Sequence, residues 1–315
     1  MSTPTSTDTE AASEQETASR GRIARLRASP FLSDLLSNRL ALIGLSIIAV
    51  MILIALYARF ALDLSAIKAS QLSNNPADAF HPPSLQYPFG ADLQARSIFP
   101  RVLYGAWYAL EFGTIVVGAS TLLGVSLGVI AAYYSDLVDN LIMRTMDILL
   151  AFPSLLLALA LVAILPESWG LWRATLALTL VYTPRFARVV RGAALKVLED
   201  EYIDATQSIG ARDPRVLARH VMPNCLAPIT VQSTLNFGLA IIDLAALSFL
   251  GFGAEVGTPT WGIMLSEGVD NGLLTGQWWW SFFPGLFLAI TVLGFNLLGD
   301  GMRDALDPRM RDAVD

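Results

Sequence analysis

Apolar residues along this chain gather into long runs that polar segments separate. A helix of about 20 apolar residues is long enough to cross the hydrocarbon core of a membrane. The fourth run is the weakest, because a proline and an arginine interrupt its end at residues 182–185. The pattern predicts an all-α polytopic membrane protein with six transmembrane helices, at residues 41–62, 110–134, 141–165, 171–190, 226–251 and 279–298.

The first run follows a long polar tail and is about as long as a full span. It therefore predicts a retained anchor helix rather than a cleaved signal peptide. The tail has no apolar periodicity, is acidic at its start and basic further on, and is expected to be disordered. The chain is predicted to comprise a cytoplasmic tail at 1–38, a first transmembrane helix at 39–63, an extracytoplasmic segment at 64–104, a five-helix core at 105–306 and a cytoplasmic C-terminal tail at 307–315.

Basic residues set the expected orientation, because lysine and arginine favour the cytoplasmic side of a membrane. With the N-terminus inside, 16 of the 21 lysines and arginines fall in cytoplasmic segments. We therefore expect both termini in the cytoplasm, in the cytoplasmic (inner) membrane of a bacterium or archaeon. The remaining five basic residues would lie outside: Arg59, Lys68, Arg96, Arg101 and Arg173.

Composition agrees with a membrane protein and excludes several other classes. Hydrophobic residues make up 54% of the chain and charged residues only 15%, against about 25% charged residues in soluble domains. Much of the acidic excess behind the net charge of −6 lies in residues 1–19, and it does not indicate a nucleic-acid partner. One cysteine and two distant histidines provide neither a disulfide nor a metal cluster, so no metal site is predicted.

Two further features of the spans suggest how the helices pack. Trp278, Trp279 and Trp280 are expected to anchor the start of the sixth span at the outer interface, as aromatic belts do, although stacking on a substrate is an alternative. Ser120 and the glycines at 124 and 128 form a row of small residues in the second span, which predicts close approach of another helix.

Polar residues at membrane depth are the candidates for a translocation path, because charge there usually faces protein or water. We expect Arg144 to pair with Asp147 on one helix face, which would give that carboxylate a structural role. Gln232 and Asn236 can equally form hydrogen bonds between helices. The candidate path residues are Asp147, Gln232, Asn236 and Asp243.

The segment 199–224, between the fourth and fifth spans, is too polar to cross a membrane. Apolar or small residues at 202, 205, 206 and 209 predict a helical stripe, and Gly210 follows as a stop signal. Asp213 and Pro214 predict the cap and first turn of a second helix, which Pro223 would end. Periodicity alone fits either a surface that contacts a partner or a helix that lies on lipid headgroups.

This segment resembles the EAA loop of binding-protein-dependent permeases, the membrane subunits of ATP-binding-cassette (ABC) importers. The family pattern is E-A-A, three residues, G, nine residues, I, one residue, L-P. Its positions correspond here to Asp204-Ala205-Thr206, Gly210, His220, Met222 and Pro223. Four letters differ from the pattern: Asp for Glu, Thr for the second Ala, His for Ile and Met for Leu.

Further segments are similar to the dipeptide, oligopeptide and nickel branch of that family, in order along the chain. Residues 90–105 resemble its G-T-D-x-x-G-R-D segment, with departures at Ala91, Ala95 and Ser97. Residues 247–253 and 259–262 resemble its S-F-L-G-x-G and P-x-W-G elements, and residues 299–309 its C-terminal signature. The resemblance implies a MetI-like permease core that translocates dipeptides or oligopeptides; nickel or another small solute is the alternative cargo.

The resemblance also implies partners and a contact surface. The partners would be a second permease subunit in a heterodimer, two cytoplasmic ABC ATPase subunits and an extracytoplasmic substrate-binding protein, all around a chain embedded in membrane lipid. In this family the EAA loop docks on the ATPase. The coupling residues are then Glu201, Asp204, Ala205, Thr206, Gly210, Ala211, Arg212 and Pro214.

The sequence contains no motif for nucleotide hydrolysis or another catalytic activity. A P-loop requires G-x-x-x-x-G-K-[ST], but Ile67 and Leu195 precede the two lysines. Hydrolase motifs are also missing. We therefore expect a non-catalytic subunit without a cofactor, with ATP and Mg²⁺ bound by partner ATPases. A secondary transporter or channel is the more distant alternative, although the inverted repeats typical of many such transporters are not evident.

Overall fold

A computed structural model describes residues 35–74, 76–134, 136–272 and 275–306. Within these ranges the chain is helical, and the only extended pairing is an isolated bridge between Ala91 and Ser97. The expected disorder of the N-terminal tail falls on residues 1–34 and the C-terminal tail on 307–315, both outside the described residues.

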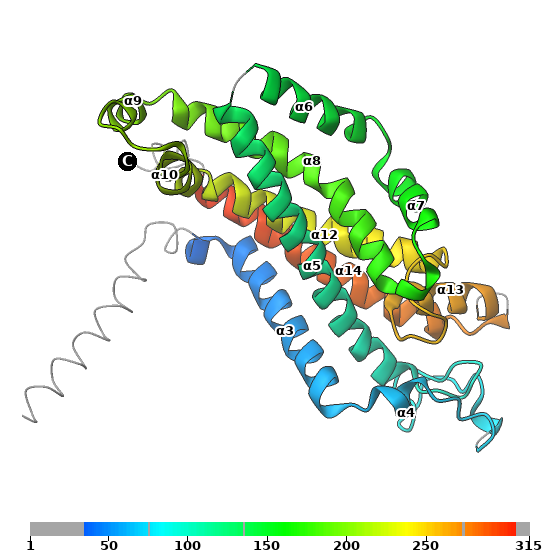
Figure 1. Ribbon diagram of the computed structural model, residues 1–315. Coiled ribbons are helices and arrows are strands. Elements are labelled where there is room, and N and C mark those ends of the chain that lie inside the picture. The colour runs from blue at the N-terminus through cyan, green and yellow to red at the C-terminus, as the bar shows by residue number, and fades with distance from the viewer. Residues whose placement is uncertain (1–34, 75, 135, 273–274, 307–315) are drawn as a thin grey trace, which may run out of the picture.

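Long helices form the body of the molecule and short ones cap its two ends (Figure 1). The long helices are α3 (Arg39–Ala61), α5 (Ile98–Tyr133), α6 (Leu137–Leu150), α7 (Ser154–Ile164), α8 (Leu171–Leu198), α12 (Leu226–Phe249), α13 (Trp261–Asn271) and α14 (Trp279–Leu306). The short ones are α4 (Leu64–Lys68), η1 (Pro76–Asp78), η2 (Glu167–Trp169), α9 (Glu201–Ser208), α10 (Asp213–Val216), the π-helical turn η3 (Leu217–Val221) and α11 (Met222–Asn224).

Four of the six predicted spans are single helices long and apolar enough to cross a membrane: α3, α5, α12 and α14. The prediction of one continuous helix at residues 141–165 is wrong. That segment is the pair α6–α7, bent by 95° at a break that contains Pro153. Proline lacks an amide hydrogen and disfavours helical geometry in the residue before it, so the helix ends there. Counting the bent pair as one span gives five candidates.

The fourth predicted span, in contrast, is longer than expected. α8 continues through Pro184 to Leu198, although the sequence predicted an interruption there. It does not count as an apolar span by composition, because its second half carries several basic residues. The six predicted segments are therefore all helical, but they are not six uninterrupted apolar helices.

Helix α5 lies at the centre of the bundle and packs against α3, α6, α8 and α12. Its closest neighbour is α8, and the predicted row of small residues is the reason. A Cβ atom added to Gly124 would lie 2.4 Å from Phe186 Cβ, and one added to Gly128 would lie 2.5 Å from the Ala187 carbonyl oxygen. The prediction that this row admits another helix is confirmed.

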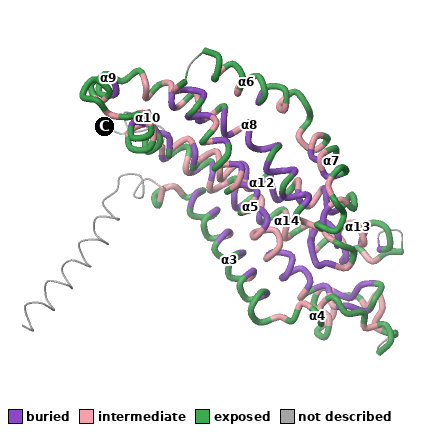
Figure 2. The backbone as a smooth tube through the Cα atoms, in the orientation of Figure 1, coloured by how far each residue is buried: buried purple, intermediate pink, exposed green. Residues whose placement is uncertain are grey.

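Burial follows this arrangement, with the interior running along α5 and α8 while outward faces of α3, α6 and α7 remain exposed (Figure 2). The exposed faces are strongly apolar; Phe60 on α3 is 81% exposed and Ile164 on α7 is 78% exposed. Such surfaces suit lipid or a neighbouring membrane subunit better than water.

The prediction that three consecutive tryptophans anchor the outer interface is wrong for two of them. Trp279 and Trp280 are buried, in a cluster with Ile98, Val102 and Met264. Only Trp278 is half exposed. The two buried rings contact the segment 80–91, with Trp279 beside the Ala91 carbonyl and Trp280 beside Phe80. They therefore hold together the end of the bundle that carries this segment, which is called the outer end below after its predicted location.

The α5–α8 contact predicts a specific effect of added volume. We expect Gly124→Ala to lower the stability of the detergent-solubilised protein by about 1–3 kcal/mol, because the added methyl group overpacks the helix contact. Gly118→Ala is the matched control, since a Cβ at Gly118 meets no atom within 4 Å. Thermal unfolding should show a lower Tm for the first variant only. Equal Tm values for the two variants would contradict the close contact.

Candidate coupling site and the outer end

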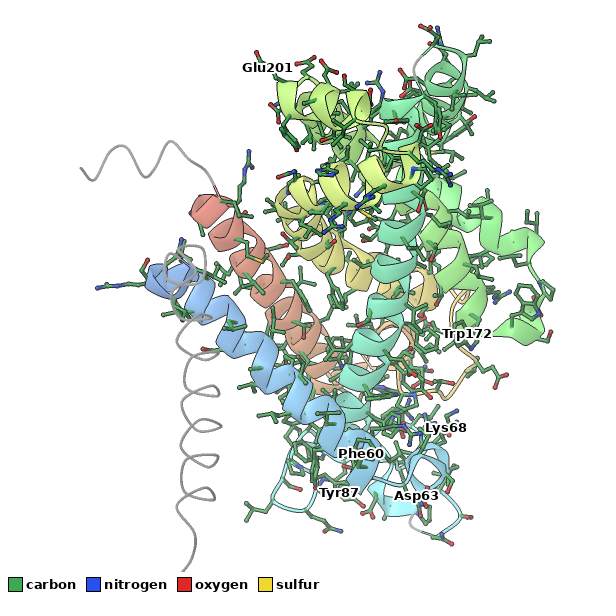
Figure 3. All side chains as sticks on the ribbon, turned by 60° about the vertical axis from the view of Figure 1, so that its left-hand side comes forward. Phe60, Asp63, Lys68, Tyr87, Trp172 and Glu201 are labelled. Atoms are coloured by element: carbon green, nitrogen blue, oxygen red, sulfur yellow. The ribbon has the colours of Figure 1, made fainter. Side chains whose placement is uncertain are left out.

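The predicted coupling segment and the predicted extracytoplasmic segment lie at opposite ends of the helix bundle. Glu201 is at one end, and Asp63, Lys68 and Tyr87 are at the other (Figure 3). The start of α3 is near the coupling end, where Asn38 Nδ2 lies 3.4 Å from Asp304 Oδ2 on α14. This separation is what a subunit with different contacts on the two sides of a membrane requires.

Helix α9 forms where periodicity predicted it, and its ends have clear local causes. Glu201 and Asp204 in the first turn suit the positive end of the helix dipole. At the other end Gly210 has a φ of +87°, its amide donates to the Gln207 carbonyl (2.9 Å), and the Ala211 amide donates to Thr206 (3.3 Å). This pair of bonds is a Schellman motif, which favours glycine at that position. The predicted stop is confirmed.

The predicted stripe of α9 is mostly exposed, and only Thr206 among its four residues is half-buried. Tyr202 is 42% exposed and Ile209 86% exposed, whereas Ile203 is 1% exposed and supplies the internal contact. The sequence analysis did not single out Ile203. The only local indication that this residue is buried was an aliphatic side chain next to the charged Asp204. Among the predicted coupling residues, Thr206 and Ala211 are half-buried and the others are exposed: Glu201, Asp204, Ala205, Gly210, Arg212 and Pro214.

Ile203 belongs to an apolar cluster that joins α9 to the long helices. The buried members of the cluster come from the halves of α5 and α8 that lie nearer to α9, from α10 and η3, and from the start of α12. They are Val129, Ala132, Val190, Ala194, Ile203, Val216, Val221, Cys225 and Ile229. Burying an aliphatic side chain of this size contributes about 1.5–3 kcal/mol. The short helix is therefore attached to the bundle and does not hang from a loose loop.

Two tyrosine hydroxyls at the end of α5 hold the start of α10 in place. The hydroxyls of Tyr133 and Tyr134 donate to the two carboxylate oxygens of Asp213, at 2.9 and 3.2 Å. The hydrogen bond to that carboxylate, followed by desolvation, raises the pKa of Tyr134, so its hydroxyl remains a donor near neutral pH. The prediction that Asp213 caps the helix is wrong, because its carboxylate is engaged by the tyrosines and Arg212 is the N-cap residue.

Pro214 does lie in the first turn of α10, as predicted, but Pro223 does not end the helical stretch. The chain continues from α10 through a π-helical turn into α11, which contains Pro223, and then into α12. Early positions of a helix tolerate proline, because their amide hydrogens need no partner within the helix. Asn224 Nδ2 of α11 lies 3.2 Å from the Tyr202 hydroxyl of α9 and adds a further link between these two helices.

The candidate path residues do not form one cluster. Gln232 Nε2 donates to Asn236 Oδ1 at 3.0 Å on α12, and Asn236 is buried. Asp243, two turns further along α12, accepts from the Tyr182 hydroxyl at 2.9 Å. Asp147 lies apart on α6, where it accepts from Arg188 Nη2 of α8 at 2.6 Å. The predicted partner Arg144 is therefore wrong: α6 packs against α8, which places Arg188 opposite the carboxylate.

Four charged side chains form a buried network at the outer end, and no pattern in the sequence predicted that they would meet. The Asp92 carboxylate, fully buried, lies 2.6 Å from Arg96 Nε and 3.0 Å from Arg101 Nη1. Glu267 on α13 lies 3.2 Å from Arg101 Nη2 and 3.5 Å from Arg96 Nη2. Two arginines thus face two carboxylates, and the network joins the outer segment, α5 and α13. Glu267 lies far from the other three along the chain, so no local pattern pointed to it.

Removing one charge of this network should lower the stability of the folded protein, because it leaves a buried charge without its partner. We expect Asp92→Asn to destabilise the purified protein by about 3–5 kcal/mol. The matched control is Asp147→Asn, whose ion pair is more than half exposed on both sides and should contribute less than about 1 kcal/mol. The measurement is Tm by thermal unfolding in detergent. A similar small change in both variants would show that the network does not hold the outer end.

Comparison with known proteins identifies relatives of this chain. Residues 124–312 match the sequence profile of the family described as "Binding-protein-dependent transport system inner membrane component". The dipeptide transport system permease DppC of Alkalihalophilus pseudofirmus is 44% identical over 278 residues, which cover 88% of each chain. A putative peptide transport system permease of Brucella suis is 42% identical, over 79% of this chain and 84% of the relative.

Two further comparisons found a similar sequence and a similar solved structure. The glutathione transport system permease GsiD of Escherichia coli is 40% identical, over 87% of this chain and 88% of the relative. A solved structure of the MetNI methionine ABC transporter in an inward-facing conformation has a chain that aligns with a TM-score of 0.52 at 18% identity. The alignment covers 67% of this chain and 98% of that one, and it shows a shared fold.

Proposed function

Because this chain belongs to the binding-protein-dependent inner-membrane permease family of ABC importers, we propose that it translocates short peptides, driven by ATPase subunits that dock on α9. The observation that carries the proposal is the exposed stripe of α9 on a firmly attached helix. Tyr202, Ala205 and Ile209 face outward, while Ile203 holds the helix to the bundle. An apolar surface that its own chain leaves uncovered at a bundle end fits a partner protein.

The attachment of α9 suits it to transmit a displacement. Side chains in a packed cluster cannot be compressed, so a shift of α9 must move the helices that share the cluster. Those helices are α5 and α8, which run to the opposite end of the molecule (Figure 1). ATPase closure would therefore displace the spanning helices as a unit and switch access to the path between the two sides of the membrane.

The chemical work is assigned to other chains. The family is a family of transport permeases, and this chain has no P-loop for nucleotide. We assign ATP and Mg²⁺ binding to the ATPase subunits and give this chain a non-catalytic role. Members of this family work with ATPase subunits and substrate-binding proteins; a second, different permease subunit is the further partner that we propose.

The orientation follows from the distribution of basic residues. With α9 in the cytoplasm, both ends of the described chain lie on the cytoplasmic side, because Asn38 lies beside Asp304 at that end. Asp63, Lys68 and Tyr87 lie at the opposite end (Figure 3), so the outer segment and its Asp92 network lie outside. The outer segment 63–97 then faces the compartment of the binding protein. We propose that this segment, held to α5 and α13 by the buried charges, helps to receive that protein.

The relatives support a peptide as the cargo. Proteins that are 40–44% identical to this chain transport dipeptides or glutathione, as their names state, and glutathione is itself a tripeptide. The nickel alternative finds no support among these relatives. The chemistry common to the cargo would be a short backbone with charged ends.

The docking surface predicts a sharp effect of one exposed side chain. We expect Ile209→Asp to abolish co-purification of the ATPase subunits without lowering the Tm of the chain, because this side chain is 86% exposed and contributes little to the internal packing of the described residues. The matched control is Val256→Asp at the outer end, where the side chain is 92% exposed. ATPase recovery with the control should equal that of the wild type.

Two outcomes would contradict this assignment. If Ile209→Asp retained the ATPase subunits and ATP-driven uptake, α9 would not be the docking surface. If both variants lost the ATPases equally, the loss would reflect general damage.

The cargo can be tested in proteoliposomes that contain the assembled transporter and its binding protein. We expect ATP-dependent uptake of radiolabelled dipeptides or tripeptides, and no uptake of free nickel ions. Uptake should stop when ATP is replaced by a non-hydrolysable analogue. Uptake of nickel but not of peptide would overturn the proposed cargo, and peptide uptake without ATP would overturn the proposed mechanism.

A further inference from the structure

The ends of α8 and α14 and the first half of α12 enclose a groove of about 690 Å³. It lies at the end of the bundle that also carries α9. Two basic residues line the groove at the helix ends: Lys196 from the last turn of α8 and Arg303 from the last turn of α14. These two residues are called the rim of the groove. Gln232 contributes an amide to the wall. None of these three residues was assigned to the coupling surface.

The rim carries two cations that form no ion pair with another described residue. Lys196 and Arg303 are both exposed. Among the residues that the structure describes, no acidic residue lines the groove. The acidic neighbour Asp304 is turned toward α3, where Asn38 lies beside it. Two cations from different helices thus face one opening.

Below the rim the groove is apolar. Val189 lies seven residues before Lys196 on the same helix, which places it about 10 Å deeper along the axis. Val231 and Leu235 line the facing wall on α12. A site with a cationic rim and apolar walls matches an amphiphile that has an anionic head and a hydrocarbon tail.

We propose that this groove binds an anionic phospholipid of the cytoplasmic leaflet. Its phosphate would lie between Lys196 and Arg303, and an acyl chain would lie along Val189, Val231 and Leu235. Lysine and arginine near helix ends reach the headgroup region in this way, and the cytoplasmic leaflet is rich in anionic lipid. Because α8 and α14 pack against α12, a lipid between them would tie the helix next to α9 to the helix next to α3. The choice of leaflet rests on the orientation proposed above.

The test uses the assembled transporter in nanodiscs or mild detergent, with phosphatidylglycerol as the probe. Native mass spectrometry would count the lipids that remain bound, and titration would give the affinity. We expect the double variant Lys196→Gln and Arg303→Gln to bind phosphatidylglycerol roughly tenfold more weakly than the wild type. The matched control is Arg39→Gln with Arg144→Gln, which removes two exposed cations that do not line the groove and should retain the lipid.

Further measurements make the result decisive. The charge-conserving variant Lys196→Arg with Arg303→Lys should keep the lipid, which separates loss of charge from loss of folding. Phosphatidylcholine should bind weakly to every variant. Unchanged phosphatidylglycerol binding in the double Gln variant would overturn the proposal, and so would a groove covered by the second permease subunit with no lipid in it. Lipid retention is read without transport, so a failed cargo assignment would not affect it.

Discussion

Ile203 is the contact through which the short polar helix α9 is held to the membrane-spanning bundle. The hydrophobic effect supplies the attachment, since the side chain is 1% exposed among aliphatic residues of α5 and α8. The same geometry turns the opposite stripe of α9 outward, including Ile209. One helix thus has a face committed to its own chain and a face available to a partner, which is the arrangement that force transfer between subunits requires.

The outer end is held by a different kind of interaction. Asp92, Arg96, Arg101 and Glu267 are removed from water to differing degrees and balance one another's charge. Such a network is strongly coupled, because each buried charge depends on its partners. Apolar packing by Trp279 and Trp280 reinforces it. Buried contacts therefore hold both ends of the bundle, and between them α5 and α8 are in close contact along the row that contains Gly124 and Gly128.

The features that could be predicted from sequence are those with local causes. The start of α8, the Schellman stop at Gly210 and the small-residue contact of α5 each follow from a short pattern. The break at Pro153 also has a local cause, although the apolar run concealed it, whereas other failures depended on tertiary placement. Asp147 pairs with Arg188 because α6 packs on α8, Asp213 is engaged by two tyrosines of another element, and Glu267 joins a network far away in sequence. No periodicity within one segment carries such information.

The most direct test of rigid coupling is a distance measured across the attachment of α9. Cys225 is the single cysteine and is buried, so after Cys225→Ala a pair of spin labels can be placed at Ser208 and Ile130 of the assembled transporter. If α9 and α5 move as one body, the distance between the labels should be the same without nucleotide and with bound ATP analogue. A change of several ångströms between these states would show that α9 moves against the bundle and would contradict the account.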